Sequence, residues 1–181
     1  MPQESATSGS VSGLTRMPGL RLNDERGRFG KVMGAEQQIE LGFEVRDMFW
    51  SRSRLGTVRG MHLQVPPKAG RKLIWVTGGS IRDVVLDLRP SSSTFLNVSE
   101  FLIDWESDAL LIPPGCAHGF EVLTGNPTVN YAQDCEYDPV CDTGVRWNSF
   151  GLTWNTVSPL VSVRDSGLPS VDEFLRHDYF A

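Results

Sequence analysis

Two short runs of this chain hold side chains that can exchange protons near neutral pH. RGMHLQ at 59–64 and IPPGCAHGF at 112–120 contain His62 and His118, two of only three histidines in the sequence. Each run is apolar and interrupted by Gly or Pro, which is typical of a strand that meets a tight turn. Because imidazole binds a proton near neutrality, these positions predict acid–base chemistry. A histidine on a strand is also commonly a hydrogen-bonded structural group, so this alternative stays open.

The composition indicates one domain with a core of its own. The chain has 181 residues, of which 40% are hydrophobic and 22% charged, with a net charge of −5. This length suits a single domain. The mild acidity gives no overall attraction to nucleic acid or to an anionic membrane, and no apolar run is long enough to span a bilayer. We therefore expect neither nucleic acid nor membrane as a partner.

The N-terminal residues predict a flexible tail over 1–13, followed by one domain over 14–181. The segment MPQESATSGSVSG is polar and rich in Ser and Gly, and it lacks the apolar stretch of a signal peptide. Cys116, Cys135 and Cys141 are too few, and odd in number, for a disulfide framework. These features predict a cytoplasmic protein with reduced thiols.

Between the tail and the C-terminus, short apolar or β-branched stretches alternate with turn sequences such as TGGS, RPSSS, PPG and TGNP. This spacing predicts an all-β fold, either a sandwich or a barrel. The expected strands are Lys72–Val76, Ile81–Leu88, Phe95–Leu102, Ala109–Ile112, Gly119–Leu123 and Thr128–Asp134. Two short helices are also expected, one over Ala35–Leu41 and one that begins after Ser170, where Glu173 completes a capping box.

The run that ends at His118 has the form PxGxxH, which resembles the second motif of the cupin and jelly-roll architecture. The resemblance implies a cupin-like jelly-roll barrel with short peripheral helices. A metal-binding cupin would have His-x-His and a nearby Glu in its first motif, but Gln64 is the residue two places after His62 and no Glu follows before Glu100. The ligands that a metal would need are missing, so we expect no metal site.

A larger set of motifs resembles the dTDP-4-dehydrorhamnose 3,5-epimerase family. The motifs follow the family's order and approximate spacing from about Leu20 to Asp165: DERGRF, RGMHLQ, RKLIWVTGGSIRDVVLDLR, IPPGCAHGF, VNYAQ, GVRW and SVRD. The resemblance implies cofactor-free epimerisation at C3, at C5 or at both in a nucleoside-diphosphate-4-keto-6-deoxy sugar. It also implies a homodimer in which an N-terminal segment helps to build the partner's substrate pocket.

The family's catalytic residues match four positions of this sequence. By resemblance His62 is the base that removes a proton beside the ketone, and Asp165 orients its ring and stabilises the imidazolium. Tyr131 matches the acid that returns a proton from the opposite face. Lys72 matches a lysine near the O4 oxyanion. Without the resemblance, Tyr131 would be a core aromatic, Lys72 a solvated strand residue and Asp165 a turn residue.

Further positions match residues that bind the sugar nucleotide. Arg59 matches a diphosphate-binding arginine, because its fork of donors suits phosphate oxygens. His118 and Asp83 match a second His–carboxylate pair in the same site. The full set of expected substrate-binding residues is Arg59, His118, Asp83, Gln64, Arg26, Arg28 and Lys31.

Two stretches depart from the pattern of the rhamnose-pathway members. Those members follow the DERG run with aromatics and a Glu that hold the thymidine, whereas this chain has Arg28-Phe29-Gly30-Lys31; it also has Asp47-Met48-Phe49-Trp50 where they have a Gln-x-Asn type pattern. The departures predict a preference for cytidine or guanosine diphosphate over thymidine diphosphate. Two alternatives remain at this stage, a metal-dependent cupin enzyme and a non-catalytic sugar-nucleotide-binding module.

Overall fold

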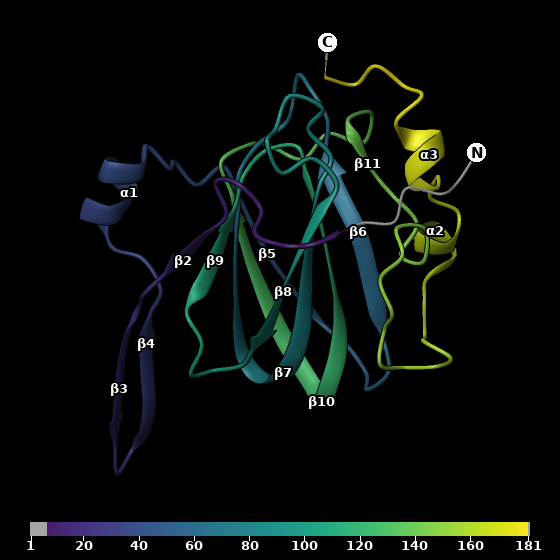
Figure 1. Cartoon of the computed structure of the whole chain (residues 1–181). Coiled ribbons are helices and arrows are strands. Elements are labelled where there is room, and N and C mark those ends of the chain that lie inside the picture. The colour runs from purple at the N-terminus through teal and green to yellow at the C-terminus, as the bar shows by residue number, and fades with distance from the viewer. Residues whose placement is uncertain (1–6, 181) are drawn as a thin grey trace.

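The computed structural model describes residues 7–180, and most of its elements are strands (Figure 1). The strands are β1 (Thr7–Ser8), β2 (Thr15–Met17), β3 (Leu20–Asp24), β4 (Gly27–Lys31), β5 (Asp47–Arg52), β6 (Val58–Gln64), β7 (Lys72–Asp87), β8 (Asn97–Ile103), β9 (Ala109–Ile112), β10 (Cys116–Gln133) and β11 (Asp142–Gly144). The helices are α1 (Ala35–Leu41), α2 (Val163–Ser166) and α3 (Val171–Phe174). The all-β prediction is confirmed.

Two long antiparallel strands, β7 and β10, form the centre of the main sheet. The order of strands through this sheet is β1-β8-β7-β10-β6-β11, and β9 pairs with β7 while β5 pairs with β10. Figure 1 shows the long strands side by side in the barrel, with α2 and α3 beside it at the C-terminal end of the chain. The apolar core fills both sides of these strands, since Val84 and Val85 are both fully buried although they point to opposite faces.

The two long strands correct a prediction, because the sequence indicates four shorter ones. TGGS and TGNP are expected to be turns, yet Gly78 and Gly79 lie inside β7 and the TGNP residues lie inside β10. The glycine pair of β7 and the TGNP segment of β10 lie opposite each other in the sheet, because Thr128 pairs with Gly78 and the register shifts on both sides of Thr124. Gly79 has φ +69°, and a Cβ there would approach Pro127 Cα to 2.9 Å. The glycine therefore allows both strands to bend together at a bulge instead of turning back.

Other predicted elements agree more closely with the structure. The strand Ala109–Ile112 and the helix Ala35–Leu41 have the expected bounds, and Ser170 and Glu173 form the expected capping box of α3. The strand expected over Phe95–Leu102 begins only at Asn97, because Leu96 has φ +63°, which ends an extended strand.

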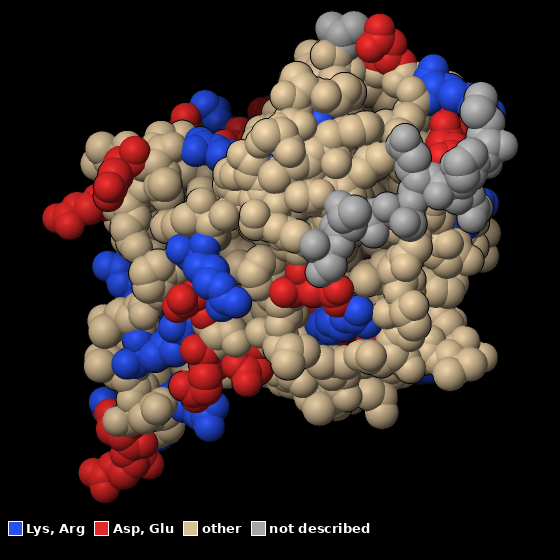
Figure 2. Space-filling view, viewed as in Figure 1, with Lys and Arg blue, Asp and Glu red and all other residues tan. Residues whose placement is uncertain are grey.

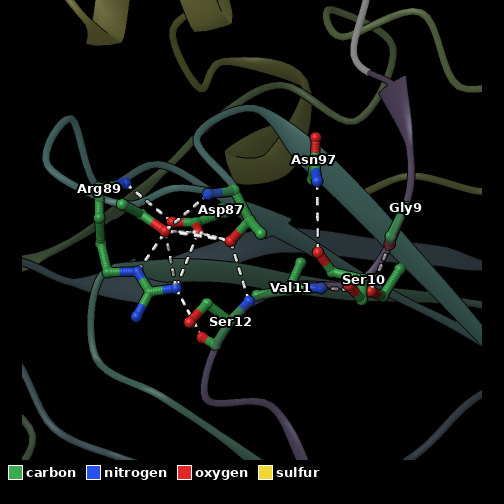
Figure 3. A network of polar contacts seen from close by, with 10 residues as sticks. Gly9, Ser10, Val11, Ser12, Asp87, Arg89 and Asn97 are labelled. Atoms are coloured by element: carbon green, nitrogen blue, oxygen red, sulfur yellow. Dashed lines mark hydrogen bonds and ion pairs between the residues drawn. The ribbon is translucent and has the colours of Figure 1, made fainter.

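The N-terminal segment differs from the expected tail over the part that the structure describes. Backbone groups of β1 pair in parallel with β8, and Val11 is buried at 4% exposure. Figure 3 shows the polar network that holds the following residues, in which the Arg89 guanidinium donates to the Ser12 carbonyl and to the Asp87 carboxylate. Burial alone would raise the pKa of Asp87, but hydrogen bonds from Arg89, Ser92 and Thr94 bring it to about 2. Residues 7–13 are thus docked on the barrel, and residues 1–6 lie outside the described part of the chain.

The hairpin formed by β3 and β4 is set apart from the barrel (Figure 1). It is a sheet of two strands in which every residue of β4 is exposed. Its contacts with the rest of the chain include Arg21, which donates to the carbonyl oxygens of Trp105 and Ser107. Figure 2 shows Lys and Arg interspersed with Asp and Glu in the region of the hairpin. None of the helices in residues 7–180 is long and apolar enough to cross a membrane.

Candidate active site

One pocket opens among β5, β6, β7 and β10, and its volume is about 490 Å³. It is lined by Asp47, Phe49, Ser51, Arg59, His62, Leu63, Gln64, Lys72, His118, Gly119, Phe120, Tyr131, Gln133, Tyr137, Asp142 and Arg164. The sheet brings these residues together from distant parts of the sequence. Six residues expected from the sequence line it, and two others, Asp165 and Asp83, lie behind its histidines.

The first histidine of the pocket, His62, is paired with a carboxylate that comes from a helix. His62 Nε2 lies 2.8 Å from Asp165 Oδ1, and the Gly60 N–H donates to the other carboxylate oxygen at 3.0 Å. Asp165 lies in the first turn of α2, where the Ser162 hydroxyl caps the helix by accepting from the Asp165 N–H at 3.0 Å. Cap and helix together set the direction of the carboxylate.

The electrostatics of this pair suit a base. Burial lowers the pKa of His62 below its ordinary value, although the hydrogen bond and the charge of Asp165 oppose that shift. Burial would raise the pKa of Asp165, but the hydrogen bonds from His62 and Gly60 bring it to about 2. A carboxylate can only accept, so we assign the proton of neutral His62 to Nε2. Its Nδ1 has no hydrogen-bond partner in the described part of the chain and is free to take a proton.

Close approach of β6 and β10 places the second histidine beside the first. His118 and His62 are partners in the antiparallel register, and the register shifts between His118 and Phe120. Gly60 and Gly119 make the approach feasible, because a Cβ on Gly60 would lie 2.5 Å from the Gly119 Cα. His118 Nε2 in turn lies 2.6 Å from Asp83 Oδ2. The strand pairing thus brings two His–Asp pairs to one pocket.

Tyr131 is buried in the same pocket and is held from several sides. Its hydroxyl lies 3.3 Å from the Ser51 hydroxyl, its ring is stacked on Phe49 with centroids 4.7 Å apart, and His118 approaches it edge-on at 6.2 Å. Burial raises the pKa of the Tyr131 phenol well above its ordinary value, against the opposing hydrogen bond of Ser51. The phenol therefore stays protonated at neutral pH and can act as a proton donor.

Lys72 is the first residue of β7 and lines the pocket. Burial lowers the pKa of this amine, while the charges of Asp142 and Asp83 raise it in part. An ammonium group with a lowered pKa is a stronger acid than an exposed one. It is therefore suited to donate a hydrogen bond or a proton to a developing oxyanion.

The predicted binding residues of the pocket differ in how free their polar groups are. Arg59 is exposed and lines the pocket, and its Nε donates to the Ser53 hydroxyl at 2.8 Å, which leaves its two terminal nitrogens without a hydrogen-bond partner in the described residues. Gln64 lines the pocket, but its amide nitrogen donates to Glu136 O at 3.0 Å and its amide oxygen accepts from the Asp138 N–H at 2.7 Å. Gln64 therefore ties β6 to the 135–138 loop and has little capacity left for a ligand.

The three predicted residues of the hairpin do not line this pocket. Arg26 donates to Asp24 in its own turn at 3.1 Å from Nε, and Arg28 lies 3.4 Å from Glu106. Lys31 ends β4 at the base of the hairpin. The physical reason is the projection of the hairpin away from the barrel (Figure 1). Within one chain these residues are not part of the site.

Several lining residues are absent from the sequence-based expectations. Ser51 and Phe49 lie on β5, and Asp142 lies on β11, where it accepts from Arg164 at 2.6 Å. Only their proximity in the sequence to residues expected at the site could have indicated them. β5 directly precedes the RGMHLQ strand, and Arg164 is the residue before Asp165 in SVRD. In residues 7–180 no group of three or more His, Cys, Asp or Glu side chains is arranged to hold a metal ion.

Comparison with known proteins gives a consistent family. Residues 9–173 match the model of the family described as dTDP-4-dehydrorhamnose 3,5-epimerase. A curated protein of that name from Sinorhizobium fredii is 32% identical over 161 residues, which are 84% of this chain and 82% of the relative.

Solved structures agree with this match. A crystal structure of dTDP-4-dehydrorhamnose 3,5-epimerase from Bacillus anthracis with TDP and PPi bound has a TM-score of 0.80 and 32% identity, covering 87% of this chain and 99% of that one. A 3'-monoepimerase from Streptomyces bikiniensis in complex with dTDP-quinovose has a TM-score of 0.84 and 26% identity, covering 94% and 89%. The predicted cupin-like jelly-roll architecture is confirmed by these neighbours.

Proposed function

The chain belongs to the dTDP-4-dehydrorhamnose 3,5-epimerase family, and from that premise we propose that it epimerises a nucleoside-diphosphate-4-keto-6-deoxy sugar beside its ketone. The observation that carries the proposal is the shared pocket, in which a carboxylate-paired histidine, a buried tyrosine and a half-buried lysine meet. The enzyme is an isomerase, and its reaction needs no net oxidation or reduction.

The base in this proposal is His62. Its Nδ1 removes the proton from the carbon next to the ketone, and the electron pair of the broken C–H bond passes into an enolate whose charge rests on O4. Asp165 stabilises the imidazolium that forms, as its short bond to Nε2 allows. The lowered pKa of His62 keeps the ring in its basic form at neutral pH.

The acid and the oxyanion partner are Tyr131 and Lys72. Lys72 donates to O4 while the enolate exists, and this contact gains strength from the buried surroundings of the amine. The Tyr131 O–H then gives its proton to the face of the carbon opposite to His62, which inverts the centre. Proton exchange with solvent afterwards returns the tyrosinate and the imidazolium to their starting forms, so atoms and charges balance.

Substrate binding involves a second copy of the chain in this proposal. Arg59 holds the diphosphate. The isolated hairpin exposes Leu20, Leu22 and Phe29 by 51%, 55% and 56%, and a two-stranded sheet is marginally stable by itself. We therefore propose a homodimer in which the hairpin, with Arg26, Arg28 and Lys31, packs on the partner beside its pocket. Sedimentation analysis tests this: Leu22→Asp should shift the protein from dimer to monomer, and a wild-type monomer would contradict it.

The nucleotide preference also depends on the hairpin. Arg28 and Lys31 can donate to base carbonyls or phosphate. The resemblance places aromatics and a Glu in this stretch of rhamnose-pathway members, whereas Arg28-Phe29-Gly30-Lys31 has one aromatic and no acidic residue. We propose tighter binding of cytidine or guanosine diphosphate than of thymidine diphosphate. Calorimetric titration with the four nucleoside diphosphates decides the matter, and a preference for thymidine diphosphate would overturn the proposal.

The activity itself is tested by isotope exchange. The purified protein is incubated in D₂O with a panel of nucleoside-diphosphate-4-keto-6-deoxy sugars, and NMR follows deuterium and configuration at C3 and C5. We expect deuterium at an inverted carbon for at least one member of the panel. Binding without exchange at any carbon would instead identify a sugar-nucleotide-binding module.

A further inference from the structure

Two polar side chains on neighbouring strands line the pocket without making a hydrogen bond to the protein. Asp47 on β5 is the register partner of Gln133 on β10, and Gln133 is in turn the register partner of Lys72 on β7. Side chains directly opposite each other in adjacent strands lie on the same face of a sheet, and all three of these residues line the pocket. They therefore form one row across the pocket wall, with Gln133 in the middle.

The amide of Gln133 is buried and has no partner. The residue is only 8% exposed, and neither its amide oxygen nor its amide nitrogen makes a hydrogen bond within residues 7–180. Buried polar side chains in folded proteins nearly always have a hydrogen-bond partner. Because Gln133 lines the pocket, a ligand in the pocket can supply that partner.

Asp47 also has no partner, and it adds a negative charge to the pocket. It is half-buried and makes no hydrogen bond or ion pair in the described residues, whereas Asp142, the other acidic residue that lines the pocket, is paired with Arg164 at 2.6 Å. An ionised carboxylate accepts hydrogen bonds and donates none. In a pocket that must also hold a diphosphate, an unpaired negative charge opposes binding unless the ligand offers it a donor. The carboxylate of Asp47 therefore suits a ligand group with an O–H or N–H bond.

The chemistry of the sugar identifies where such a donor lies. Lys72, at one end of the row, is the residue proposed to donate to O4. On one side of C4 the sugar carries C5, with a methyl group and the ring oxygen, and neither of these can donate a hydrogen bond. On the other side it carries the substituents of C3 and C2. An acceptor such as Asp47 beside the O4 site is therefore satisfied only by the C3 side of the sugar.

We propose that Asp47 and Gln133 form a subsite for hydrogen-bond donors at C2 and C3 of the sugar. The protein then acts on 4-keto-6-deoxy sugars that keep hydroxyl or amino groups at these carbons, and it discriminates against their 2,3-dideoxy counterparts. The inference rests on the proposed function and names its substrate class. Asp47 accepts from the donor, and the Gln133 amide, which can donate and accept, binds the same group or its neighbour. Neither residue takes part in proton transfer to or from carbon.

The test compares three substrates that carry the same nucleotide. One is a nucleoside-diphosphate-4-keto-6-deoxy sugar with hydroxyls at C2 and C3, the second is its 3-amino counterpart, and the third is its 2,3-dideoxy counterpart. All three keep acidic protons beside the ketone, so deuterium uptake from D₂O, followed by NMR, gives kcat and KM for each. The hydroxyl and amino substrates show which donor the subsite prefers.

The variants remove the subsite in steps. Asp47→Leu removes the acceptor, Asp47→Asn removes the charge but keeps an amide oxygen, and Gln133→Met replaces the amide by an apolar side chain of similar length. Asp178→Leu is the matched control, because Asp178 is exposed, lies outside the pocket and makes no hydrogen bond or ion pair in the described residues. Circular dichroism confirms that each variant is folded.

We expect the wild type to favour a donor-bearing substrate over the dideoxy substrate by about 10- to 100-fold in kcat/KM, the range that corresponds to a hydrogen bond with a charged group. Asp47→Leu should remove most of this preference by raising KM for the donor-bearing substrates, and it should leave the dideoxy substrate within about 2-fold of the wild type. Asp47→Asn and Gln133→Met should fall between these limits, and Asp178→Leu should keep the wild-type preference.

Three outcomes count against the inference. Equal use of all three substrates by the wild type overturns it and leaves the proposed function intact, and this measurement needs no variant. An equal loss on all three substrates in folded Asp47→Leu also overturns it, because Asp47 would then contact the nucleotide and not the sugar. Absence of deuterium uptake with any substrate overturns the proposed function together with the inference.

Discussion

Two His–Asp pairs lie side by side in one pocket, and they differ in exposure and in the origin of the carboxylate. In the pair of His62 and Asp165 the side chains are 25% and 6% exposed, whereas in the pair of His118 and Asp83 they are 4% and 0% exposed. The hydrogen bonds are similar in length, at 2.8 Å and 2.6 Å. The two pairs therefore differ in the exposure of the histidine and not in hydrogen-bond length, and the greater exposure identifies His62 as the base.

The carboxylates also differ in how completely they are satisfied. Asp165 comes from α2 and accepts from Gly60 as well as from His62. Asp83 comes from the centre of β7, and its Oδ1 is buried without a hydrogen-bond partner in the described residues. A half-satisfied buried carboxylate depends heavily on its one partner. The comparison assigns the chemistry to His62 and Asp165. It assigns to His118 and Asp83 a structural role in the barrel, next to Tyr131.

The largest expected effect separates the two histidines by rate. We expect His62→Ala to lower the rate of epimerisation by on the order of 10²–10⁴-fold, because the base acts mainly in the transition state. Nucleotide binding should persist, since it depends on the diphosphate and base contacts. Turnover by NMR and binding by calorimetry check both expectations. Near-wild-type turnover by folded His62→Ala would remove His62 from the mechanism.

The next largest effect tests the acid, Tyr131, whose ring contacts His118 edge-on. Tyr131→Phe removes the proton donor but keeps the ring and its stack on Phe49. Proton removal by His62 should continue, so solvent deuterium enters the substrate with retention while formation of inverted product falls sharply. NMR in D₂O measures both quantities, and unchanged product formation would contradict the assignment of the acid.

A smaller effect concerns the pH dependence of the exposed pair. His62 is active as the neutral base, so kcat/KM should fall as the pH drops through its pKa, which burial places below the ordinary 6.5. Asp165 opposes that shift, so Asp165→Asn should lower the pKa further and move the acid limb of the profile to lower pH. We also expect a rate loss on the order of 10²-fold, because the ring loses its orienting acceptor. A limb that moves to higher pH would contradict this electrostatic account.

Sequence patterns predicted elements whose signals are local. The capping box at Ser170 and the helix over Ala35–Leu41 depend on nearby residues, and both agree with the structure. The Gly-Gly of TGGS is also a local signal, but pairing across the sheet overrides it, because the opposite strand bulges at the same level. Strand length in this fold is therefore decided by long-range pairing that a local pattern does not contain.

The candidate site shows the same limit. His62 and His118 could be selected from their side-chain chemistry, and the resemblance to a family supplied Tyr131, Lys72 and Asp165. Phe49 was noted only as part of a stretch that departs from the rhamnose-pathway pattern, and only the register that pairs Phe49 with Tyr131 shows its contact. The hairpin residues were expected at the site, but their place relative to a pocket depends on how the hairpin packs, which a single chain does not determine.

The smallest expected effect on rate, and a larger one on stability, comes from the buried pair. His118→Leu leaves Asp83 buried with neither carboxyl oxygen hydrogen-bonded, and an unsatisfied buried polar group costs about 1–3 kcal/mol. The free energy of unfolding should therefore fall by about 3 kcal/mol, measured by urea denaturation. His62→Ala should cost only about 1 kcal/mol, since that ring is partly exposed. The double variant His118→Leu with Asp83→Val should regain much of the loss, because no buried polar group is left without a hydrogen-bond partner. Equal losses in the two single variants, or no recovery in the double variant, would show that the two His–Asp pairs do not divide chemistry and stability in this way.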